Sequence, residues 1–504
     1  MNLAEIIEPH DPGAVALRFQ GEDLTYGDLR SRCAELRAGL TARGVAPGER
    51  VALLLGNTPE FPIAYLAVLG IGAVAVPLNP HSPAAELDRE LRTVREAAVL
   101  VANTGGLGAA APDAVVDELR SLEHEVVDVG AVAAGLPAAG GALAPIVDRE
   151  PDDPAALLFT SGTAGSPRAA ILTHGSLLAN IEQVELRVGL AATSEDVGLL
   201  AVPAFHVLGL NAILGVQLYA GGRLVLVERF DPAGALETIA TERVTILAGV
   251  PQLFAALADL PGATGRELAS VRLACSGAAP LDAEIAARFE ERFGVPIRQG
   301  YGLTEASPTV TFPDLSTACD PSSVGVPLPG VELRVVDADG EEVEPGDPGE
   351  ILVRGPNVFA GYFEDAAASA AALDRAGWLH TGDVGVVSED GDLRIVDRQK
   401  DLIIVSGFNV YPAEVEQVLV QLPEVADAVV VGVPDHEEGE SVRAFVVPEP
   451  ALWPEDQREP ALTAAQLQAE CARHLARYKC PSEVTFVREL PRGLAGKVLR
   501  RAVG

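Results

Sequence analysis

Apolar and polar residues alternate with two different periods at the start of the chain. Apolar residues recur at helical spacing from Leu24 to Leu40, and again from Phe61 to Val74. Short apolar runs at Arg50 to Leu55 and at Val74 to Leu78 have the length of buried strands. Strands that alternate with helices in this way predict β-α-β units, in which largely parallel sheets are buried between helices.

The same alternation continues through the middle of the chain and then changes character. Further segments keep the strand-and-helix order at Leu199 to Val202, Asn211 to Leu218, Leu224 to Val227 and Thr245 to Ala248. From Gly325 to Arg354, short alternating segments such as Glu332 to Val336 and Glu350 to Val353 are separated by Gly, Pro and Asp turns. This second pattern predicts an antiparallel subdomain.

A smaller unit is predicted to begin near Lys400. Its first helix should open at Pro412, where helices tolerate proline, and its apolar face is marked by Val415, Val418, Leu419 and Leu422. Around this helix the pattern predicts strands at Asp401 to Val405, Ala426 to Val433, Val442 to Val447 and Glu483 to Val487, and a second helix at Ala465 to Leu475. We therefore predict an α/β protein. Its large amino-terminal region, residues 1–396, combines mostly parallel sheets flanked by helices with an antiparallel β subdomain, and residues 401–504 form a small α+β domain.

Length and composition place the chain among globular proteins without a membrane span. The chain has 504 residues and 48% hydrophobic content, which is enough for two or more domains with cores of their own. The longest apolar stretch, Ala64 to Leu78, is interrupted by glycine and proline and is too short to cross a bilayer. Acidic residues at Glu5, Glu8 and Asp11 leave no secretory signal at the amino terminus. We expect a cytoplasmic protein.

Charge and cysteine usage exclude several classes of partner. The net charge of −35 argues against nucleic acid and anionic membrane, because binding to either needs basic patches. The five cysteines show no C-x-x-C spacing and no accompanying histidine cluster, so we expect buried thiols and no metal or redox site. Only three of the 37 basic residues are lysines, at Lys400, Lys479 and Lys497, and the others are arginines.

The stretch TSGTAGSPRAA, from Thr160 to Ala170, has the composition of a phosphate-binding loop. Its hydroxyls and glycines offer side-chain and main-chain donors to anionic oxygens, and it follows the apolar run Ala155 to Phe159, which predicts a buried strand. The loop therefore lies at the carboxyl end of a strand, where α/β folds bind ligands. It is not a Walker loop, because no Gly-Lys-Ser/Thr closes it. The candidate phosphate-binding residues are Thr160, Ser161, Gly162, Thr163 and Arg168.

Five further segments follow the loop in a fixed order. Together with the loop they resemble the motifs of the adenylate-forming superfamily, which contains acyl-CoA synthetases, luciferases and the adenylation domains of peptide synthetases. The resemblance covers nearly the whole chain, and the motifs are highly specific as a set. They are SGAAPL at 276–281, GYGLTEA at 300–306, GWLHTGD at 377–383, DRQKDLIIVSGFNVYPAEVE at 397–416 and PRGLAGKVLRR at 491–501.

The resemblance implies an ATP site and a magnesium ligand. Tyr301 would stack on adenine, Thr304 would donate to the α-phosphate, and Glu305 would hold Mg²⁺, a hard cation that prefers carboxylate and phosphate oxygens. Asp383 would accept both ribose hydroxyls, and Arg398 would reach the ribose. Small residues would leave room for the base and for the acid at Gly277, Ala278, Ala279, Gly300 and Gly302.

The resemblance also implies two half-reactions at one site and a mobile carboxy-terminal domain. Lys497 would bridge the substrate carboxylate and the α-phosphate during adenylation, in which ATP and the acid form an acyl-AMP. Residues 397–400 would act as the hinge, centred on Lys400. After rotation, the residues Ser406, Gly407 and Phe408 would line the path of the pantetheine thiol that displaces AMP.

The acid pocket is expected around PAFHVLGL, residues 203–210. Relatives that activate amino acids place an aspartate here to pair with the substrate ammonium, whereas this chain has Phe205 and His206. An unpaired buried ammonium is costly, which argues against amino acids as substrates. The pocket candidates Phe205, His206, Leu210, Ala278 and Gly302 suggest a bulky apolar acid. His206 is either a core histidine or a group that acts in the pocket.

The sequence therefore predicts an acyl-CoA ligase that uses ATP, Mg²⁺ and coenzyme A. The thiol of a carrier protein is the nearer alternative to coenzyme A. A catalytically silent nucleotide-binding homologue and a luciferase-like oxidase are further alternatives. Neither the identity of the acid nor the number of subunits follows from the motifs.

The phosphate loop departs from its family at three positions. Ala164, Arg168 and Ala169 stand where the usual pattern has Thr, Lys and Gly, so a hydroxyl is missing and a planar guanidinium replaces a compact ammonium. These changes fall where the β- and γ-phosphates would bind, whereas an acyl-AMP would not depend on them. They raise the hypothesis of a thiolation-only ligase, supplied with an acyl-adenylate by a separate adenylating ligase.

Overall fold

The computed structural model describes most of the chain as two compact units. The first unit comprises Met1–Pro80, Val94–Leu158 and Ala169–Asp397, and the second comprises His81–Thr93, Phe159–Arg168 and Arg398–Gly504. The described residues are 1–95, 99–102, 113–129, 144–161, 167–187, 191–316, 320–337, 339–398, 403–410, 412–436, 439–449, 452–453 and 460–490. The predicted α/β class is confirmed. The domain limits at residues 396 and 401 stay predictions.

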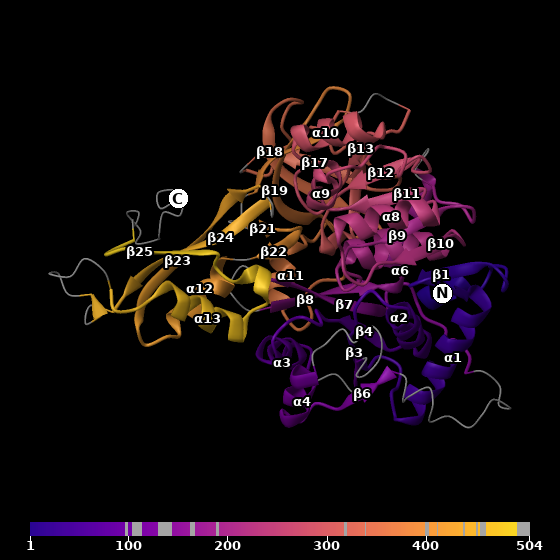
Figure 1. Cartoon of the computed structure of the whole chain (residues 1–504), viewed down its shortest axis with the longest axis horizontal. Coiled ribbons are helices and arrows are strands. Elements are labelled where there is room, and N and C mark those ends of the chain that lie inside the picture. The colour runs from indigo at the N-terminus through magenta and orange to yellow at the C-terminus, as the bar shows by residue number, and fades with distance from the viewer. Residues whose placement is uncertain are drawn as a thin grey trace. The chain divides into compact units, whose positions relative to one another are not determined.

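A seven-stranded sheet forms one layer of the first unit. Its strands pair in parallel except for the β1–β2 hairpin at one edge. Helices α8, α9 and α10 lie beside this sheet and share a hydrophobic core with it (Figure 1). In order across the sheet, the strands are β13 (Ile297–Gln299), β12 (Leu273–Ser276), β11 (Ile246–Gly249), β9 (Val197–Leu200), β10 (Arg223–Leu226), β1 (Val15–Phe19) and β2 (Glu22–Thr25).

A six-stranded sheet contains the strands on either side of the phosphate loop. The run predicted as a strand at 155–159 lies inside β7, and the loop's last residues lie in β8. In order, the strands are β6 (Val126–Asp128), β5 (Val99–Ala102), β3 (Arg50–Leu54), β4 (Val74–Pro77), β7 (Pro154–Ser161) and β8 (Pro167–Thr173). The pairs from β6 to β7 are parallel, as the alternating pattern predicted.

Two smaller sheets complete the first unit. The predicted antiparallel subdomain is a four-stranded sheet in the order β17 (Glu332–Val336), β18 (Pro348–Arg354), β19 (Leu379–Val387) and β20 (Leu393–Arg398). A three-stranded antiparallel sheet has the order β14 (Tyr301–Gly302), β15 (Thr309–Phe312) and β16 (Val326–Pro327). Tyr301 and Gly302 of the predicted nucleotide site lie in the three-stranded sheet, and Asp383 and Arg398 lie in the four-stranded sheet.

The helices of the first unit differ from the predicted limits at their ends. The first long helix begins at Tyr26 and not at Leu24, because residues 22–25 pair with β1 and Thr25 then caps the helix through a reciprocal contact with Asp28. The helices are η1 (Leu3–Ile7), α1 (Tyr26–Ala42), α2 (Glu60–Ile71), α4 (Asp113–Ser121), α6 (His174–Leu186), η2 (Leu208–Gly215), α7 (Val216–Tyr219), α8 (Pro232–Glu242), α9 (Pro251–Asp259), α10 (Ala283–Phe293), η3 (Thr304–Ala306) and α11 (Ala366–Ala372). None of the described helices has the length and apolar content needed to cross a bilayer.

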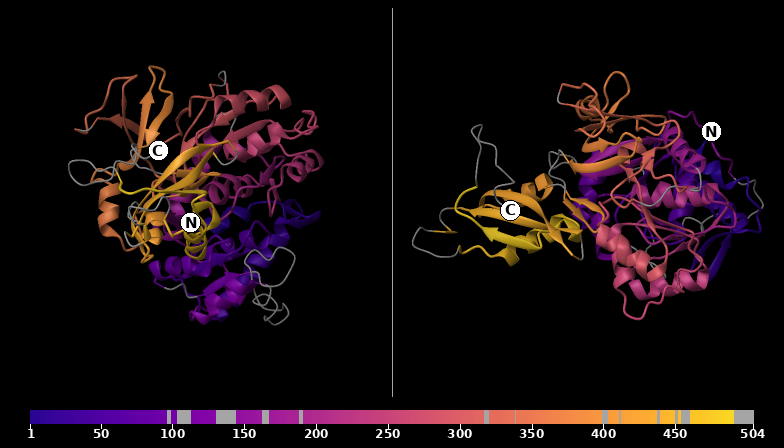
Figure 2. Two further views of the ribbon diagram at one scale, coloured as in Figure 1. Left: turned by 60° about the vertical axis from the view of Figure 1, so that its left-hand side comes forward. Right: turned by 90° about the horizontal axis from the view of Figure 1, so that it is seen from above.

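The second unit is an α+β body whose strands and helices match the predicted pattern. Figure 2 shows the part of this unit that follows residue 398, coloured orange to yellow, from two further directions. Its strands are β22 (Phe408–Val410), β21 (Ile403–Val405), β24 (Gly439–Pro448), β23 (Val425–Asp435) and β25 (Glu483–Phe486), and its helices are α12 (Pro412–Val420), α13 (Ala464–His474), η5 (Arg477–Lys479) and α3 (Ala84–Thr93). Val415, Val418 and Leu419 of α12 are buried, as their spacing predicted.

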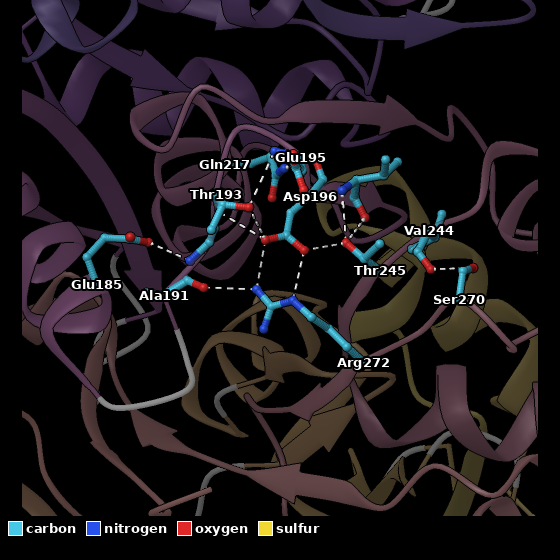
Figure 3. Close-up of polar contacts among 12 residues, drawn as sticks. Glu185, Ala191, Thr193, Glu195, Asp196, Gln217, Val244, Thr245, Ser270 and Arg272 are labelled. Atoms are coloured by element: carbon cyan, nitrogen blue, oxygen red, sulfur yellow. Dashed lines mark hydrogen bonds and ion pairs between the residues drawn. The ribbon is translucent and has the colours of Figure 1, made fainter.

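A buried carboxylate joins three neighbouring strands of the seven-stranded sheet at their amino ends. Asp196 precedes β9, Thr245 precedes β11 and Arg272 precedes β12 (Figure 3). Arg272 donates to both carboxylate oxygens of Asp196, at 2.8 and 2.9 Å, and Thr245 donates to one of them at 2.7 Å. Thr193 adds a side-chain and a main-chain hydrogen bond, both 2.9 Å. Burial raises the pKa of Asp196, but these hydrogen bonds outweigh it and lower the pKa to about 2.

We expect Asp196→Asn to destabilise the first unit by about 2 kcal/mol at neutral pH, because a neutral amide cannot form the ion pair with the Arg272 guanidinium. The folded-state pKa of Asp196 lies below its ordinary value of 3.8. Its contribution is therefore present above pH 3.8 and lost as the pH falls through about 2. Urea unfolding at pH 7 measures the change. Asp117→Asn, in an exposed pair with Arg120, is the control. A loss no larger than that of the control would contradict the assignment.

Candidate active site

Two predicted nucleotide residues, far apart in sequence, meet in the first unit. Tyr301 lies in β14 and Asp383 lies in β19. The Tyr301 hydroxyl donates to Asp383 Oδ2 at 2.7 Å. Both residues are buried, with exposed fractions of 7% and 8%. A carboxylate accepts hydrogen bonds from hydroxyl groups, as its contact with Tyr301 shows, and its predicted role with the ribose is of the same chemical kind.

The predicted phosphate and magnesium residues lie in the short helix that follows β14. Thr304 and Glu305 begin η3, directly after the strand that carries Tyr301. The Glu305 carboxylate accepts a hydrogen bond of 2.6 Å from the hydroxyl of Tyr362. Tyr362 was missed by the sequence analysis. Its one local signal is the preceding Gly361, whose φ of +120° marks a turn and not a chemical function.

The structure gives packing reasons for two of the predicted glycines. A Cβ on Gly302 would lie 2.2 Å from the carbonyl oxygen of Pro308, and a Cβ on Gly300 would lie 2.8 Å from the ring of Phe312. Both glycines are therefore required by the close approach of β15, whatever binds beside them. By contrast, a Cβ on Gly277 would meet only a Leu208 methyl at 3.9 Å, so this turn is open.

The turn after β12 adopts a conformation that is unusual for its residues. Ala278 has a φ of +69°, in the left-handed region that favours glycine. Gly277, Ala278 and Ala279 all remain partly exposed, and they follow the carboxyl end of a parallel strand. Strained backbone at the end of a central strand is a common feature of ligand sites. This placement agrees with the predicted role of the turn beside the base and the acid.

The residues predicted to line the acid pocket divide into core and accessible positions. Leu210 is buried in the main core of the first unit, whereas Phe205 and Leu208 pack against that core and remain partly accessible. On the neighbouring strands, Ala248 in β11 and Cys275 in β12 are paired in register and are also only partly buried. These side chains are all apolar. Burial raises the pKa of Cys275 to about 12, so it presents a neutral thiol.

His206 is a neutral imidazole at physiological pH. Burial lowers its pKa to about 4. Its Nδ1 accepts a weak 3.4 Å hydrogen bond from the amide of Leu208, and its carbonyl oxygen accepts from the amide of Leu210 at 2.9 Å. His206 therefore lies just before η2, a π-helical segment of the kind that often lies at functional sites. Its catalytic role stays a prediction.

Part of the phosphate loop is described by the structure. Thr160 and Ser161 end β7, and Arg168 and Ala169 lie in β8. Ala169 is buried, and its carbonyl oxygen accepts a hydrogen bond of 2.8 Å from the amide of Phe363. Its methyl group is therefore accommodated within a paired strand. Gly162, Thr163 and Ala164 lie outside the described residues.

The second unit contains the predicted thiol-path residues. Ser406 and Gly407 form the turn between β21 and β22, with φ values of +50° and +83°. Phe408 begins β22, and its ring stacks on Tyr478 at 4.5 Å. Arg398 ends β20. Lys400 and Lys497 lie outside the described residues.

The second unit also contains a buried ionic cluster that the sequence did not reveal. Lys479, 8% exposed, contacts Glu86 of α3 and lies 3.1 Å from Glu414 of α12. Glu86 also accepts the amide hydrogen of Ala476 at 2.6 Å. Burial, and then the Glu86 charge, raise the pKa of the nearby Glu90 to about 8. One lysine therefore faces three carboxyl groups.

Comparison with known proteins supplies an independent test of the predicted class. The family model for AMP-binding enzymes matches residues 8–363, and the model for the AMP-binding enzyme C-terminal domain matches residues 414–497. A feruloyl-CoA synthase from an Amycolatopsis species is 38% identical over 98% of this chain and 96% of its own length.

Two further relatives agree with these matches. A 3-[(3aS,4S,7aS)-7a-methyl-1,5-dioxo-octahydro-1H-inden-4-yl]propanoyl:CoA ligase from Mycobacterium tuberculosis is 38% identical over 97% of this chain and 94% of its own length. Among solved structures, an amide bond synthetase from Marinactinospora thermotolerans superposes with a TM-score of 0.88 at 32% identity. That match covers 100% of this chain and 99% of the synthetase.

Proposed function

Because this chain belongs to the family of AMP-binding enzymes and is an acid–thiol ligase of the acyl-CoA synthetase type, we propose that it joins a bulky apolar carboxylic acid to coenzyme A through an acyl-AMP. The observation that carries the proposal is the hydrogen bond between Tyr301 and Asp383. This hydrogen bond brings together residues of two separate nucleotide motifs. One of them, Tyr301, lies four positions before Glu305 in the sequence. This arrangement supports binding of AMP by base, ribose and phosphate together.

The residues around Glu305 fit a magnesium ion. One carboxylate oxygen accepts from Tyr362, and no hydrogen bond from the described part of the chain reaches the other. No group of three or more His, Cys, Asp or Glu side chains suitable for a metal occurs among the described residues. A single carboxylate that shares the ion with substrate phosphates is a common arrangement for Mg²⁺. When bound, the ion would neutralise charge on the phosphates of ATP.

The chemistry requires two steps at this site. In the first, a carboxylate oxygen of the acid attacks the α-phosphorus of ATP, and the bond to pyrophosphate breaks. In the second, the sulfur of coenzyme A attacks the activated carbonyl carbon, the bond to AMP breaks, and the thiol proton is released. Thr304 and Lys497 are proposed to stabilise the charge of the first step by donating to the α-phosphate and the carboxylate. Asp383 is proposed to hold the adenylate through both steps.

The proposed acid class is supported by the apolar groups near the open turn. Phe205, Leu208, Ala248 and Cys275 offer no acidic partner to a substrate ammonium. The two ligase relatives carry names that specify a feruloyl group and a fused-ring propanoyl group, both larger than acetyl. The neutral His206 adds no charge to this surface.

We expect aromatic, fatty or polycyclic acids to exceed acetate and glycine in kcat/KM by on the order of 100-fold or more, because an apolar pocket gains affinity with each buried group. The measurement is pyrophosphate release and thioester formation across a panel of acids, with ATP and coenzyme A. Acetate outperforming every larger acid would refute the proposed acid class. Equal thioester formation on a carrier-protein thiol would reassign the acceptor.

A second candidate function follows from the altered phosphate loop. Arg168 replaces the lysine of the usual pattern, and guanidinium and ammonium are not equivalent at phosphate sites. This favours a ligase that only converts a supplied acyl-AMP to a thioester. The same panel separates the two candidates if each acid is supplied once with ATP and coenzyme A, and once as its acyl-AMP with coenzyme A alone. Comparable rates from both starting points would eliminate the second candidate.

A further inference from the structure

We propose that Tyr362 is a positioning residue for adenylation, which fixes the carboxylate of Glu305 relative to the strand that leaves the phosphate loop. The inference rests on the proposed function and assigns a role to a residue outside the recognised motifs. Two sets of contacts carry it. One joins the Tyr362 side chain to Glu305, and the other joins the surrounding backbone to β8.

The side-chain contact is short and directed at a charged group. Tyr362 Oη donates to Glu305 Oε1 at 2.6 Å, within the range of charge-assisted hydrogen bonds. The Tyr362 ring is held in turn by Phe359, with ring centroids 4.9 Å apart in an edge-to-face arrangement. Phe359 is buried, and its amide donates to the carbonyl oxygen of Glu305 at 2.9 Å. The residue that carries the carboxylate is therefore bound through both its side chain and its backbone.

The backbone around Tyr362 pairs with β8. Ala170 and Tyr362 are antiparallel bridge partners. The amide of Phe363 donates to Ala169 at 2.8 Å, and the amide of Ile171 donates to Gly361 at 2.9 Å. Residues 360–363 therefore act as a short added strand at the start of β8. This is the strand that contains Ala169, one of the three altered loop positions.

The turn that presents Tyr362 depends on its neighbours. Gly361 has a φ of +120°, and a Cβ there would lie 2.9 Å from Ser369 Oγ. Ser369 Oγ also accepts the amide hydrogen of Tyr362 at 2.8 Å. Ser369 of α11 thus fixes the backbone of Tyr362, and Tyr362 fixes Glu305. A tyrosine held this firmly selects one orientation of the carboxylate at little entropic cost.

The two carboxylate oxygens of Glu305 therefore have different roles. Oε1 is engaged by Tyr362, so Oε2 is the oxygen directed to an incoming cation. Residues that orient a metal ligand in this way typically change metal affinity by about 10-fold to 100-fold when they are mutated. Only the half-reaction that handles pyrophosphate should depend on this orientation. The thiolation of a preformed acyl-AMP should not.

The test is Tyr362→Phe, which removes only the hydroxyl. We expect the Mg²⁺ concentration for half-maximal pyrophosphate release to rise about 10-fold, and binding of Mn²⁺ in the presence of ATP, followed by electron paramagnetic resonance, to weaken by a similar factor. The rate from acyl-AMP and coenzyme A should stay within twofold of wild type. Tyr26→Phe is the matched control, because its hydroxyl also makes a buried hydrogen bond, 2.8 Å to Gly222, in the core of the same unit.

A double-mutant cycle excludes a merely structural role. In a Glu305→Gln background, Tyr362→Phe should have no further effect on Mn²⁺ binding, because the two residues act through one carboxylate. Unchanged Mn²⁺ binding in the single variant would overturn the inference, as would an equal loss in both half-reactions. If the wild type binds Mn²⁺ and ATP and Tyr362→Phe binds Mn²⁺ equally well, the proposed function stands and the role of Tyr362 is refuted. Wild-type protein that binds neither would overturn both.

Discussion

Asp383→Ala is expected to reduce turnover of a preformed acyl-adenylate with coenzyme A by on the order of 100-fold to 10,000-fold, since two charge-assisted hydrogen bonds of about 1.5–3 kcal/mol each are lost. The carboxylate of Asp383 is buried, and the Tyr301 hydroxyl donates to it at 2.7 Å. Another group therefore does not easily take its place as an acceptor in the variant. Single-turnover kinetics and direct AMP binding measure the effect. Arg398→Ala is also expected to reduce this turnover, because its motif predicts that Arg398 reaches the ribose.

The control for this prediction is a carboxylate in the same antiparallel sheet. Glu332 lies in β17 and pairs with Arg354 at the surface, so Glu332→Ala should leave adenylate turnover unchanged. Thermal unfolding of both variants separates a loss of binding from a loss of folding. Wild-type turnover in Asp383→Ala would remove Asp383 from the proposed site.

Lys479→Met is expected to destabilise the second unit by about 3–5 kcal/mol at pH 8, because the buried carboxyl groups of Glu86 and Glu414 and the partly buried Glu90 lose their common cation. Burial lowers the pKa of Lys479, but Glu86 and its other acidic neighbours raise it well above its usual value, so the lysine stays charged across the working range. Thermal unfolding of wild type and variant at pH 6 and pH 8 measures the change. Arg473→Met, in a pair whose arginine is 72% exposed, is the surface control.

The pH dependence of this loss has a definite sign. Glu90 binds its proton more tightly in the folded unit, with a pKa of about 8 against an ordinary value of 4.5. The folded state therefore holds more protons than the unfolded state between these values, and stability falls as the pH rises through this window. Removing Lys479 should steepen that fall. A variant that is equally destabilised at pH 6 and pH 8 would show that the carboxyl groups do not act as a coupled set.

The sequence predicted those elements whose pattern is local. The strands at 50–54 and 74–77 and the helix opening at Pro412 are placed by runs of buried apolar residues, and these were predicted to within a few positions. The start of α1 was not, because the hairpin that ends at Thr25 depends on pairing with β1. In the antiparallel subdomain, the sequence predicted the strands β17 and β18, whereas β19 and β20 lie beyond the predicted range 325–354.

The sites that sequence reasoning missed are all made by long-range contacts. Tyr362 and Glu305 are separated by 57 positions, and Lys479 and Glu86 by 393. No spacing rule relates such residues. Lys479 is notable as one of only three lysines, but its rarity does not identify its carboxyl partners. At Gly302, the motif suggested a ligand-binding role. A close contact with the backbone of Pro308 already requires glycine at this position.

The Asp196 network has a consequence for altering the choice of acid. The network secures β9, β11 and β12 at their amino ends, whereas the turn at Gly277 and the segment around Phe205 follow the opposite, carboxyl ends. The anchor therefore lies at the amino ends of these strands, and the proposed recognition of the acid lies at their carboxyl ends. Loops from related ligases could be grafted at the recognition edge without disturbing the anchor, so libraries that diversify those loops would retain a folded scaffold.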